Sequence, residues 1–319
     1  MNLKRILVTS KIILTEGGMI ERIKRDEFVK LDPNIAHSGL IYDKKGREIL
    51  RKIYSGYIDV GRKYNCPVLS LAPTWRANPE RIEKSVFRNK RKEINSDCVD
   101  FLNDIRKTYF DFSKSIFIGG MMACKGNAYN PKEALSKNEA KLFHQEQAKY
   151  LAESNVDFIK AATLPALSEA LGIAAAISTY NIPYILSFVI NGDASLLDGT
   201  PIYKAIEIID SEIDHIPLLY MINCVHPTIF EKAISKEAII SPNILNRILG
   251  FQANSSSKSP SELDNLSYLD TTQPEEFADL MFSIHKKFGT KILGGCCGTD
   301  DSHINALAKK IFNKNKLKD

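Results

Sequence analysis

The chain has 319 residues, of which 44% are hydrophobic and 25% charged, and its formal net charge is +5. This composition is typical of a soluble globular protein, and the mild positive charge, spread along the chain, does not predict a nucleic-acid partner. No apolar run is long enough for a membrane span or a signal peptide. Six cysteines are too few for a disulfide scaffold at this length and suit a reducing compartment, so we expect a cytoplasmic protein.

Eight short apolar runs recur along the chain, and each ends in small or polar residues before a helical pattern begins. They span residues 12–14, 67–71, 116–118, 158–161, 184–189, 216–220, 248–251 and 292–293. Strands that alternate with helices predict a parallel sheet, and eight such units predict an α/β protein with a closed (β/α)8 TIM barrel, a single domain spanning 1–319. A doubly wound open sheet is the alternative, but no glycine-rich dinucleotide fingerprint follows the first run.

Helix signals lie between the runs. Asn130-Pro131 with Glu133 combines an N-cap, a first-turn proline and a capping-box acid, which predicts a helix start. Thr200-Pro201 and Asp301-Ser302 predict two more starts, because apolar residues at helical spacing follow each. Gly289 is placed to end the helix before the last run. The basic stretch 84–92 is interpreted as a solvated helix face rather than a phosphate-binding patch.

Three cysteines fall where apolar runs end. Cys224 follows the sixth run, and Cys296 and Cys297 follow the eighth, between Gly295 and Gly298. The carboxyl ends of barrel strands meet at one mouth, where active sites form, and the glycines let the backbone turn so that adjacent cysteines can face one point. Three thiolates are typical of a catalytic zinc site with an open fourth position. For Cys296-Cys297 alone, two small buried apolar residues are the alternative.

Other polar residues are expected at the same mouth because they also end apolar runs. They are Glu16, Thr74, Thr163 and Asn254. The remaining cysteines are expected outside the ligand set: Cys66 at the opposite end of the barrel, Cys98 in a helix, and Cys124 after the third run, near the mouth. The polar segment 255–272 is interpreted as a lid, with an irregular excursion as the alternative.

Zinc bound by three thiolates carries a net negative charge, so it is a poor Lewis acid but can hold a fourth sulfur as thiolate. This predicts alkylation of a small-molecule thiol by a cationic methyl donor, a sulfonium or an ammonium, that leaves as a neutral molecule. Trp75 and Tyr129 are candidates for a cation–π wall around such a donor, with ordinary packing as the alternative.

The chain resembles the homocysteine S-methyltransferase family over nearly its whole length. The residues that carry the resemblance are Asn223-Cys224 with Pro227, the run from Gly294 to Thr299, the turn Glu16-Gly17-Gly18-Met19, Asp198-Gly199-Thr200, and Gln252-Ala253-Asn254. The resemblance implies a (β/α)8 barrel, one catalytic Zn²⁺ on Cys224, Cys296 and Cys297, and conversion of homocysteine to methionine. We assign substrate binding to Glu16, Gly17, Gly18, Thr74, Thr163 and Asn223. The chain is similar to the short members that use S-methylmethionine or S-adenosylmethionine, rather than to those that use betaine, folate or cobalamin.

Two positions depart from the family pattern. Glu16 stands where the family usually has Asp, and Ala162 stands where it usually has Glu. In the family these acids help to hold the amino group of homocysteine, so here that recognition is expected to be weaker or to come from another group such as Glu16. Another small thiol is therefore an alternative acceptor. A barrel that binds zinc or a thiol without catalysis, and a redox sensor built on Cys296-Cys297, are further alternatives. The sequence leaves the methyl donor and the oligomeric state open.

Overall fold

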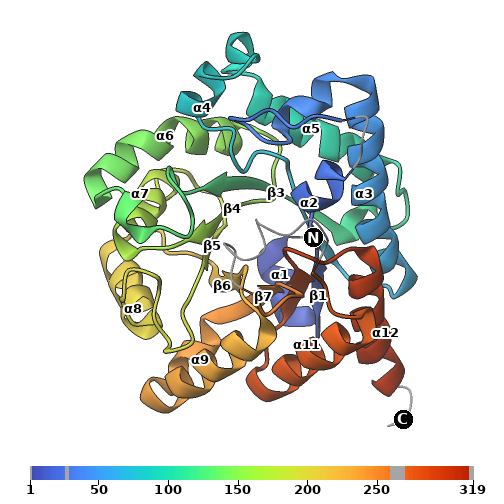
Figure 1. The fold of residues 1–319 in the computed structure, drawn as a ribbon, viewed down its shortest axis with the longest axis vertical. Coiled ribbons are helices and arrows are strands. Elements are labelled where there is room, and N and C mark those ends of the chain that lie inside the picture. The colour runs from blue at the N-terminus through green and yellow to red at the C-terminus, as the bar shows by residue number, and fades with distance from the viewer. Residues whose placement is uncertain (1, 26–28, 259–269, 316–319) are drawn as a thin grey trace.

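Eight parallel strands close into a barrel in chain order, and the last strand pairs with the first (Figure 1). The computed structural model describes residues 2–25, 29–258 and 270–315. The strands are β1 (Ile13–Thr15), β2 (Val68–Leu71), β3 (Ile116–Ala123), β4 (Phe158–Leu164), β5 (Tyr184–Phe188), β6 (Leu219–Asn223), β7 (Ile248–Ala253) and β8 (Ile292–Gly295). The predicted (β/α)8 barrel is therefore confirmed, and the open-sheet alternative is wrong.

Helices surround the strands (Figure 1). The longer ones are α3 (Lys44–Lys63), α5 (Ile94–Lys107), α6 (Lys137–Glu153), α7 (Leu167–Ile177), α8 (Ile202–Glu212), α9 (Pro227–Ile240), α11 (Pro274–Phe288) and α12 (Asp301–Asn315). Shorter pieces are α4 (Pro79–Glu83) and the 3-10 turns η1 (Ser38–Tyr42), η2 (Arg88–Lys90), η3 (Ser113–Ser115), η4 (Pro131–Glu133) and η5 (Pro242–Asn246). No helix of the described ranges is both long and apolar enough to cross a membrane.

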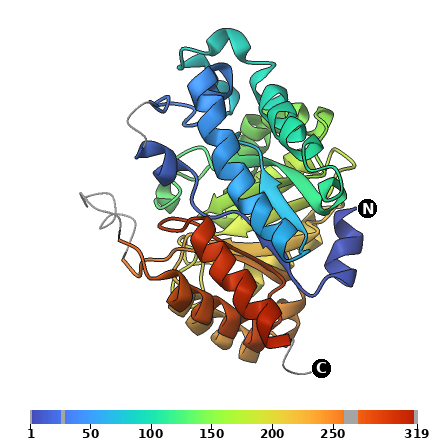
Figure 2. The same ribbon diagram turned by 90° about the vertical axis from the view of Figure 1, so that its right-hand side faces the viewer.

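Two short helices lie at opposite ends of the barrel: α1 (Leu3–Thr9) and α2 (Ile20–Lys24) (Figure 2). The apolar face of α1 packs against side chains that fill the barrel interior, among them Ile13 and Phe158. It therefore closes the amino-terminal end of the barrel. The strands are buried on both faces, toward the interior and toward the helices, and this is why each reads as a continuous apolar run instead of an alternating one. The carboxyl ends of the strands are left to form the site.

Some predicted boundaries are wrong. The third run does not end at Gly119-Gly120, because β3 continues to Ala123. A side chain at Gly120 would lie 2.8 Å from the Leu151 side chain of α6, so the glycine there makes room for a helix and does not turn the chain. The sixth strand begins at Leu219 and leaves Ile216 outside it, 40% exposed. Gly289 does end α11 in the left-handed conformation, as expected.

The helix start predicted at Asn130 is also wrong. The Asn130 side chain does accept a hydrogen bond from the Lys132 backbone, but the chain makes only the short turn η4 there. The helix begins at Lys137, where Ser136 and Glu139 form a capping box. In the basic stretch 84–92 the structure has turns around η2 and no extended helix face. The starts predicted for α8 and α12 are confirmed.

Candidate active site

The three predicted cysteines converge at the carboxyl-terminal mouth of the barrel. Cys224 directly follows β6, and Cys296 and Cys297 directly follow β8; their Sγ atoms all lie within 4.8 Å of one another. They line a cavity of about 300 Å³ together with residues from the ends of several other strands. The structure joins Cys224 to Cys296 as a disulfide, with their Cα atoms 5.6 Å apart. A redox pair of Cys296 with Cys297 stays an untested alternative.

Two non-glycine residues at this mouth have left-handed backbones: Thr163 with φ 64° and Cys224 with φ 58°. Such conformations cost about 1–3 kcal/mol each and persist only where neighbouring groups enforce them. Asn223 is one such group, since its side chain is buried between the two. Its Oδ1 accepts hydrogen bonds from the Thr163 N–H (3.0 Å) and the Ser187 hydroxyl (2.6 Å). Its Nδ2 donates to the Thr163 hydroxyl (2.9 Å) and to Cys224 Sγ (3.2 Å). Asn223 therefore fixes the direction of the Cys224 side chain.

The last residues of strand β7 and Asn254, which follows it, position all three cysteines. The Cys224 N–H donates to the Gln252 carbonyl (3.1 Å), and the Cys296 N–H donates to the Ala253 carbonyl (2.7 Å). The Cys297 N–H donates to Asn254 Oδ1 (3.2 Å). Two separate chain segments are thus held against one strand end, and this brings the thiols together.

The glycine turn after β1 packs directly on the cysteine turn. The Gly18 N–H donates to the Thr299 carbonyl (3.0 Å), and a side chain at Gly18 would lie 2.9 Å from the Cys296 carbonyl oxygen. Gly298 has φ 76°, a conformation that side chains rarely adopt. These two positions require glycine because the turns approach each other closely and reverse sharply.

Glu16 and Lys160 are two buried titratable groups beside the pocket, close enough for each to influence the charge of the other. Glu16 Oε1 accepts hydrogen bonds from the Ser70 hydroxyl and the Leu71 N–H, each at 2.7 Å. Burial raises the pKa of Glu16 to about 7, and these hydrogen bonds and the nearby Lys160 ammonium oppose that shift. Burial also lowers the pKa of Lys160, which is 2% exposed, to about 7. Lys160 donates to Gln252 Oε1, and Gln252 Nε2 donates to the carbonyls of Glu16 and Gly295 (3.4 Å each).

The donor set fits zinc. Sulfur atoms bound tetrahedrally at about 2.3 Å from zinc lie about 3.8 Å apart. The three thiols all lie within 4.8 Å of one another, so the cluster is compact enough for one ion, and an all-sulfur set favours a soft or borderline metal. The fit requires the reduced form, because the Cys224–Cys296 bond uses two of the three donors. Cys224, Cys296 and Cys297 are the one such group among the described residues.

Most of the other predicted site residues also line the cavity. They are Glu16, Gly17, Gly18, Thr163, Asn223, Asn254, Trp75 and Tyr129. Thr74 is not among the described lining residues: it is fully buried, and its hydroxyl donates to the Met121 carbonyl (2.8 Å) and accepts from the Met121 N–H (2.9 Å). It therefore ties the end of β2 to β3 and does not face the cavity.

The other three cysteines lie outside the cluster, as expected. Cys66 is buried with its thiol near the Ile12 carbonyl (3.4 Å), just before β1, and Cys98 is buried in α5. Cys124 follows β3 but its thiol points to the Gly126 carbonyl (3.6 Å). Burial raises the pKa of Cys66 and of Cys124 to about 12, so both are inert thiols at neutral pH.

Several residues that shape the site were not predicted from the sequence. Ser70 and Ser187 bind Glu16 and Asn223, and Tyr57 donates from its hydroxyl to the Gly18 carbonyl (2.9 Å). Lys160 carried a usable signal, since a lysine inside an apolar strand is almost never buried without a partner. Glu21 lines the cavity and accepts a hydrogen bond from the Gly298 N–H (2.5 Å).

Only the ends of the predicted lid can be described, because residues 259–269 lie outside the described residues. Those ends are fastened to the cysteine turn. The Ser255 N–H donates to the Cys297 carbonyl (3.0 Å), and the Thr271 hydroxyl donates to the Gly298 carbonyl (2.7 Å). The lid itself stays a prediction.

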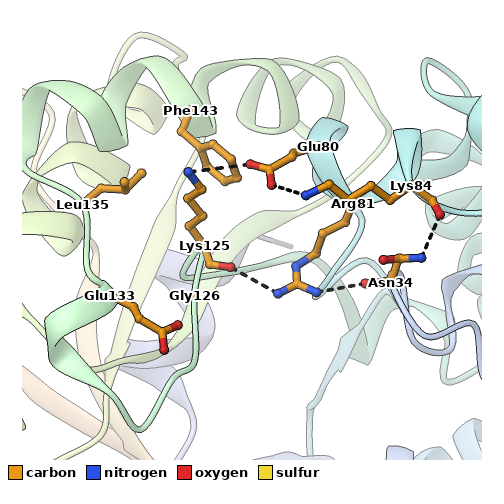
Figure 3. A pocket seen from close by; sticks show the side chains of 9 residues that line it. All are labelled: Asn34, Glu80, Arg81, Lys84, Lys125, Gly126, Glu133, Leu135 and Phe143. Atoms are coloured by element: carbon orange, nitrogen blue, oxygen red, sulfur yellow. Dashed lines mark hydrogen bonds and ion pairs between the residues drawn. The ribbon is translucent and has the colours of Figure 1, made fainter.

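A second cavity, of about 370 Å³, lies at the surface between α4 and the segment after β3 (Figure 3). Its charged groups bind one another: Glu80 pairs with Lys84 (2.6 Å) and with Lys125 (3.7 Å). Arg81 donates to the carbonyls of Asn34 (3.3 Å) and Lys125 (3.2 Å). Since these groups are already paired and no thiol lines this cavity, we place the functional site at the barrel mouth.

Fold and site together define a (β/α)8 barrel with a three-thiol centre at its carboxyl-terminal mouth. The chain belongs to the homocysteine S-methyltransferase family, whose pattern matches residues 13–311. It is 23% identical to homocysteine S-methyltransferase YbgG of Bacillus subtilis (strain 168), over 96% of each chain. It is 21% identical to homocysteine S-methyltransferase 2 of Arabidopsis thaliana, over 97% of this chain and 96% of that one. The metallated form of the homocysteine methyltransferase MmuM from Escherichia coli superposes with a TM-score of 0.76 at 17% identity, covering 97% of this chain and 99% of that one.

Proposed function

We propose that this protein is a zinc-dependent S-methyltransferase that moves a methyl group from a sulfonium donor to the thiolate of homocysteine, giving methionine. The observation that carries the proposal is the convergence of Cys224, Cys296 and Cys297 within 4.8 Å in a cavity of about 300 Å³. The names of its curated relatives and the metallated state of the E. coli structure support it. Its cysteine usage supports a cytoplasmic location.

Cys224, Cys296 and Cys297 would hold the zinc. When bound there, the metal supplies the chemistry of keeping an acceptor sulfur deprotonated and nucleophilic. The protein's own contribution is alignment, because Asn223, Gln252, Ala253 and Asn254 fix the directions of the three cysteines. In the overall reaction a bond forms between the acceptor sulfur and the methyl carbon, and the methyl–sulfonium bond breaks with its electron pair. The donor leaves as a neutral thioether, and the thiol proton goes to solvent.

The aromatic lining favours a cationic donor on one side of the cavity. Trp75 and Tyr129 both line it. The Arg76 guanidinium lies 4.3 Å from the centre of the Trp75 ring and covers one of its faces. Only the opposite face of Trp75 can therefore meet a sulfonium, and Arg76 weakens that attraction by like-charge repulsion.

The test is a matrix of acceptors and donors on reduced, zinc-loaded protein. Homocysteine and other small thiols are combined with S-methylmethionine, S-adenosylmethionine and betaine, and methylated products are measured by mass spectrometry. Methionine formed from homocysteine with a sulfonium, and little with betaine, supports the proposal. Absence of methyl transfer with every pair, despite one zinc per chain, would overturn it in favour of a zinc- or thiol-binding barrel.

A further inference from the structure

The helix α2 carries two opposite charges on the wall of the thiol cavity. Glu21 and Lys24 both line it, three residues apart, so they project from one face of the helix. No described residue forms an ion pair with either side chain. An α-amino acid has the complementary pair, an ammonium and a carboxylate on one carbon.

Contacts on two sides of α2 hold it against the barrel. Ile23 is fully buried, and Arg22, on another side of the helix, pairs with Asp301 of α12 (2.7 Å) and lies over the Tyr57 ring. Glu21 accepts a hydrogen bond from Gly298 N–H, the residue after Cys297. The carboxylate of Glu21 therefore lies next to the cysteine turn, within reach of an acceptor whose sulfur meets the thiols.

The other charged groups of the cavity wall are less available. Glu16 is buried and bound by Ser70 and Leu71, with the Lys160 ammonium close by. His37 is neutral at physiological pH, because burial lowers its pKa to about 4. Glu21 is only partly buried and Lys24 is exposed at the edge of the cavity, so both can reach a ligand without a large desolvation cost.

We infer that Glu21 and Lys24 recognise the acceptor as an α-amino acid zwitterion: Glu21 binds its ammonium group and Lys24 its carboxylate. The inference rests on the proposed function and names two specificity-determining residues for it. The amino group is then recognised by α2. Glu16 is poorly placed for this role, because it is buried and already hydrogen-bonded to Ser70 and Leu71.

The test separates the two charges by using truncated acceptors. Homocysteine carries both groups, 4-mercaptobutanoate lacks the ammonium, and 3-aminopropane-1-thiol lacks the carboxylate. For Glu21→Gln we expect KM to rise about tenfold for homocysteine and for the aminothiol, and to stay unchanged for 4-mercaptobutanoate. For Lys24→Gln we expect a similar rise for homocysteine and 4-mercaptobutanoate but not for the aminothiol. Zinc content should be unchanged in both variants.

Two controls match the changes in charge. Arg25→Gln removes a neighbouring positive charge that does not line the cavity, and Glu48→Gln removes an exposed acid on α3. A second readout does not need turnover: titration calorimetry with L-methionine and with 4-(methylthio)butanoate. If Glu21→Gln and Lys24→Gln leave both the KM for homocysteine and the Kd for methionine within twofold of wild type, the inference is overturned. No methyl transfer in the wild type would instead count against the proposed function, and the methionine titration would still decide this inference.

Discussion

Asn223→Ala should both destabilise the barrel and weaken zinc binding at the proposed site. The Asn223 side chain is buried and makes four hydrogen bonds that link β4, β5 and β6. Removing it leaves the buried Thr163 N–H without an acceptor, which costs about 1–3 kcal/mol. The Ser187 hydroxyl can rotate toward another partner and adds less, while relaxation of the left-handed residues Thr163 and Cys224 offsets part of the loss. We expect a net destabilisation of about 1–3 kcal/mol.

The assay is urea unfolding of reduced, metal-free protein, followed by circular dichroism, so that metal binding does not contribute to the free energy. Asn243→Ala is the control, because Asn243 is exposed on η5, and it should lie within about 0.5 kcal/mol of wild type. Zinc affinity is then measured by competition with a chelator, and should fall in Asn223→Ala alone. A destabilisation under about 0.5 kcal/mol with unchanged zinc affinity would refute the view that Asn223 holds the backbone at Thr163 and Cys224.

Three further predictions test the site and its supports. Serine substitution of Cys224, Cys296 or Cys297 should abolish zinc retention and methyl transfer while the barrel stays folded, because the proposed zinc site lies at the mouth and not in the core. Zinc lost from Cys124→Ser, or kept in Cys224→Ser, would show that the ligand set is wrong. Gly298→Ala should be more destabilising than Gly289→Ala in the same unfolding assay. Both glycines have positive φ, so the backbone strain of alanine costs about 1 kcal/mol at each, but the added methyl group meets Ser255 at Gly298 and open space at Gly289. Equal effects of the two substitutions would contradict the close approach of Ser255 to Gly298. Asp300→Ala should cost about 1 kcal/mol at pH 7, because hydrogen bonds from His303 and Ser302 hold the pKa of Asp300 below its usual range. A depressed carboxyl pKa stabilises fully above the unfolded value of about 3.9, so this difference should shrink as the pH falls below about 4 and vanish only below the lower pKa of the folded state; a pH-independent difference would contradict it.

The barrel and the convergence of three cysteines at its mouth were predictable because their signals are local. A strand buried on both faces is a continuous apolar run, and each run could be counted directly. Parallel strands then place their carboxyl ends at one mouth, so a cysteine after the sixth run and two after the eighth had to meet there. That rule needs no knowledge of loop conformation.

The supports of the site were not predictable, because they depend on contacts between distant segments. Asn223 reaches Thr163 and Ser187 across two strands, and nothing in the sequence near Thr163 signals a positive φ. Thr74 ends a run like its neighbours, yet its hydroxyl turns to Met121 and away from the cavity. Position at a strand end predicts the mouth, but only side-chain direction decides which residues line it.

The local helix signal at Asn130 failed for a different reason. The cap formed, since the Asn130 side chain does bind a backbone N–H, but a second cap six residues later at Ser136 started the helix. Glu133, expected as the capping-box acid of that helix, binds Asn127 N–H and the Asn130 side chain in the turn instead. Two competing caps in one loop cannot be ranked from their residue types alone.

The groups that touch the cysteines have one property in common: Asn223, Gln252 and Asn254 reach them through neutral amides or carbonyls. An amide both donates and accepts, so it can align a thiol without adding charge. A cation in the same place would reduce the nucleophilicity of the sulfur, and an anion would repel a thiolate. The nearby Lys160 does not contact the cysteines in this way; it donates to Gln252 Oε1. In its ammonium form Lys160 can only donate, so Gln252 accepts there and donates from Nε2 to the carbonyls of Glu16 and Gly295, which belong to the two turns that carry the site.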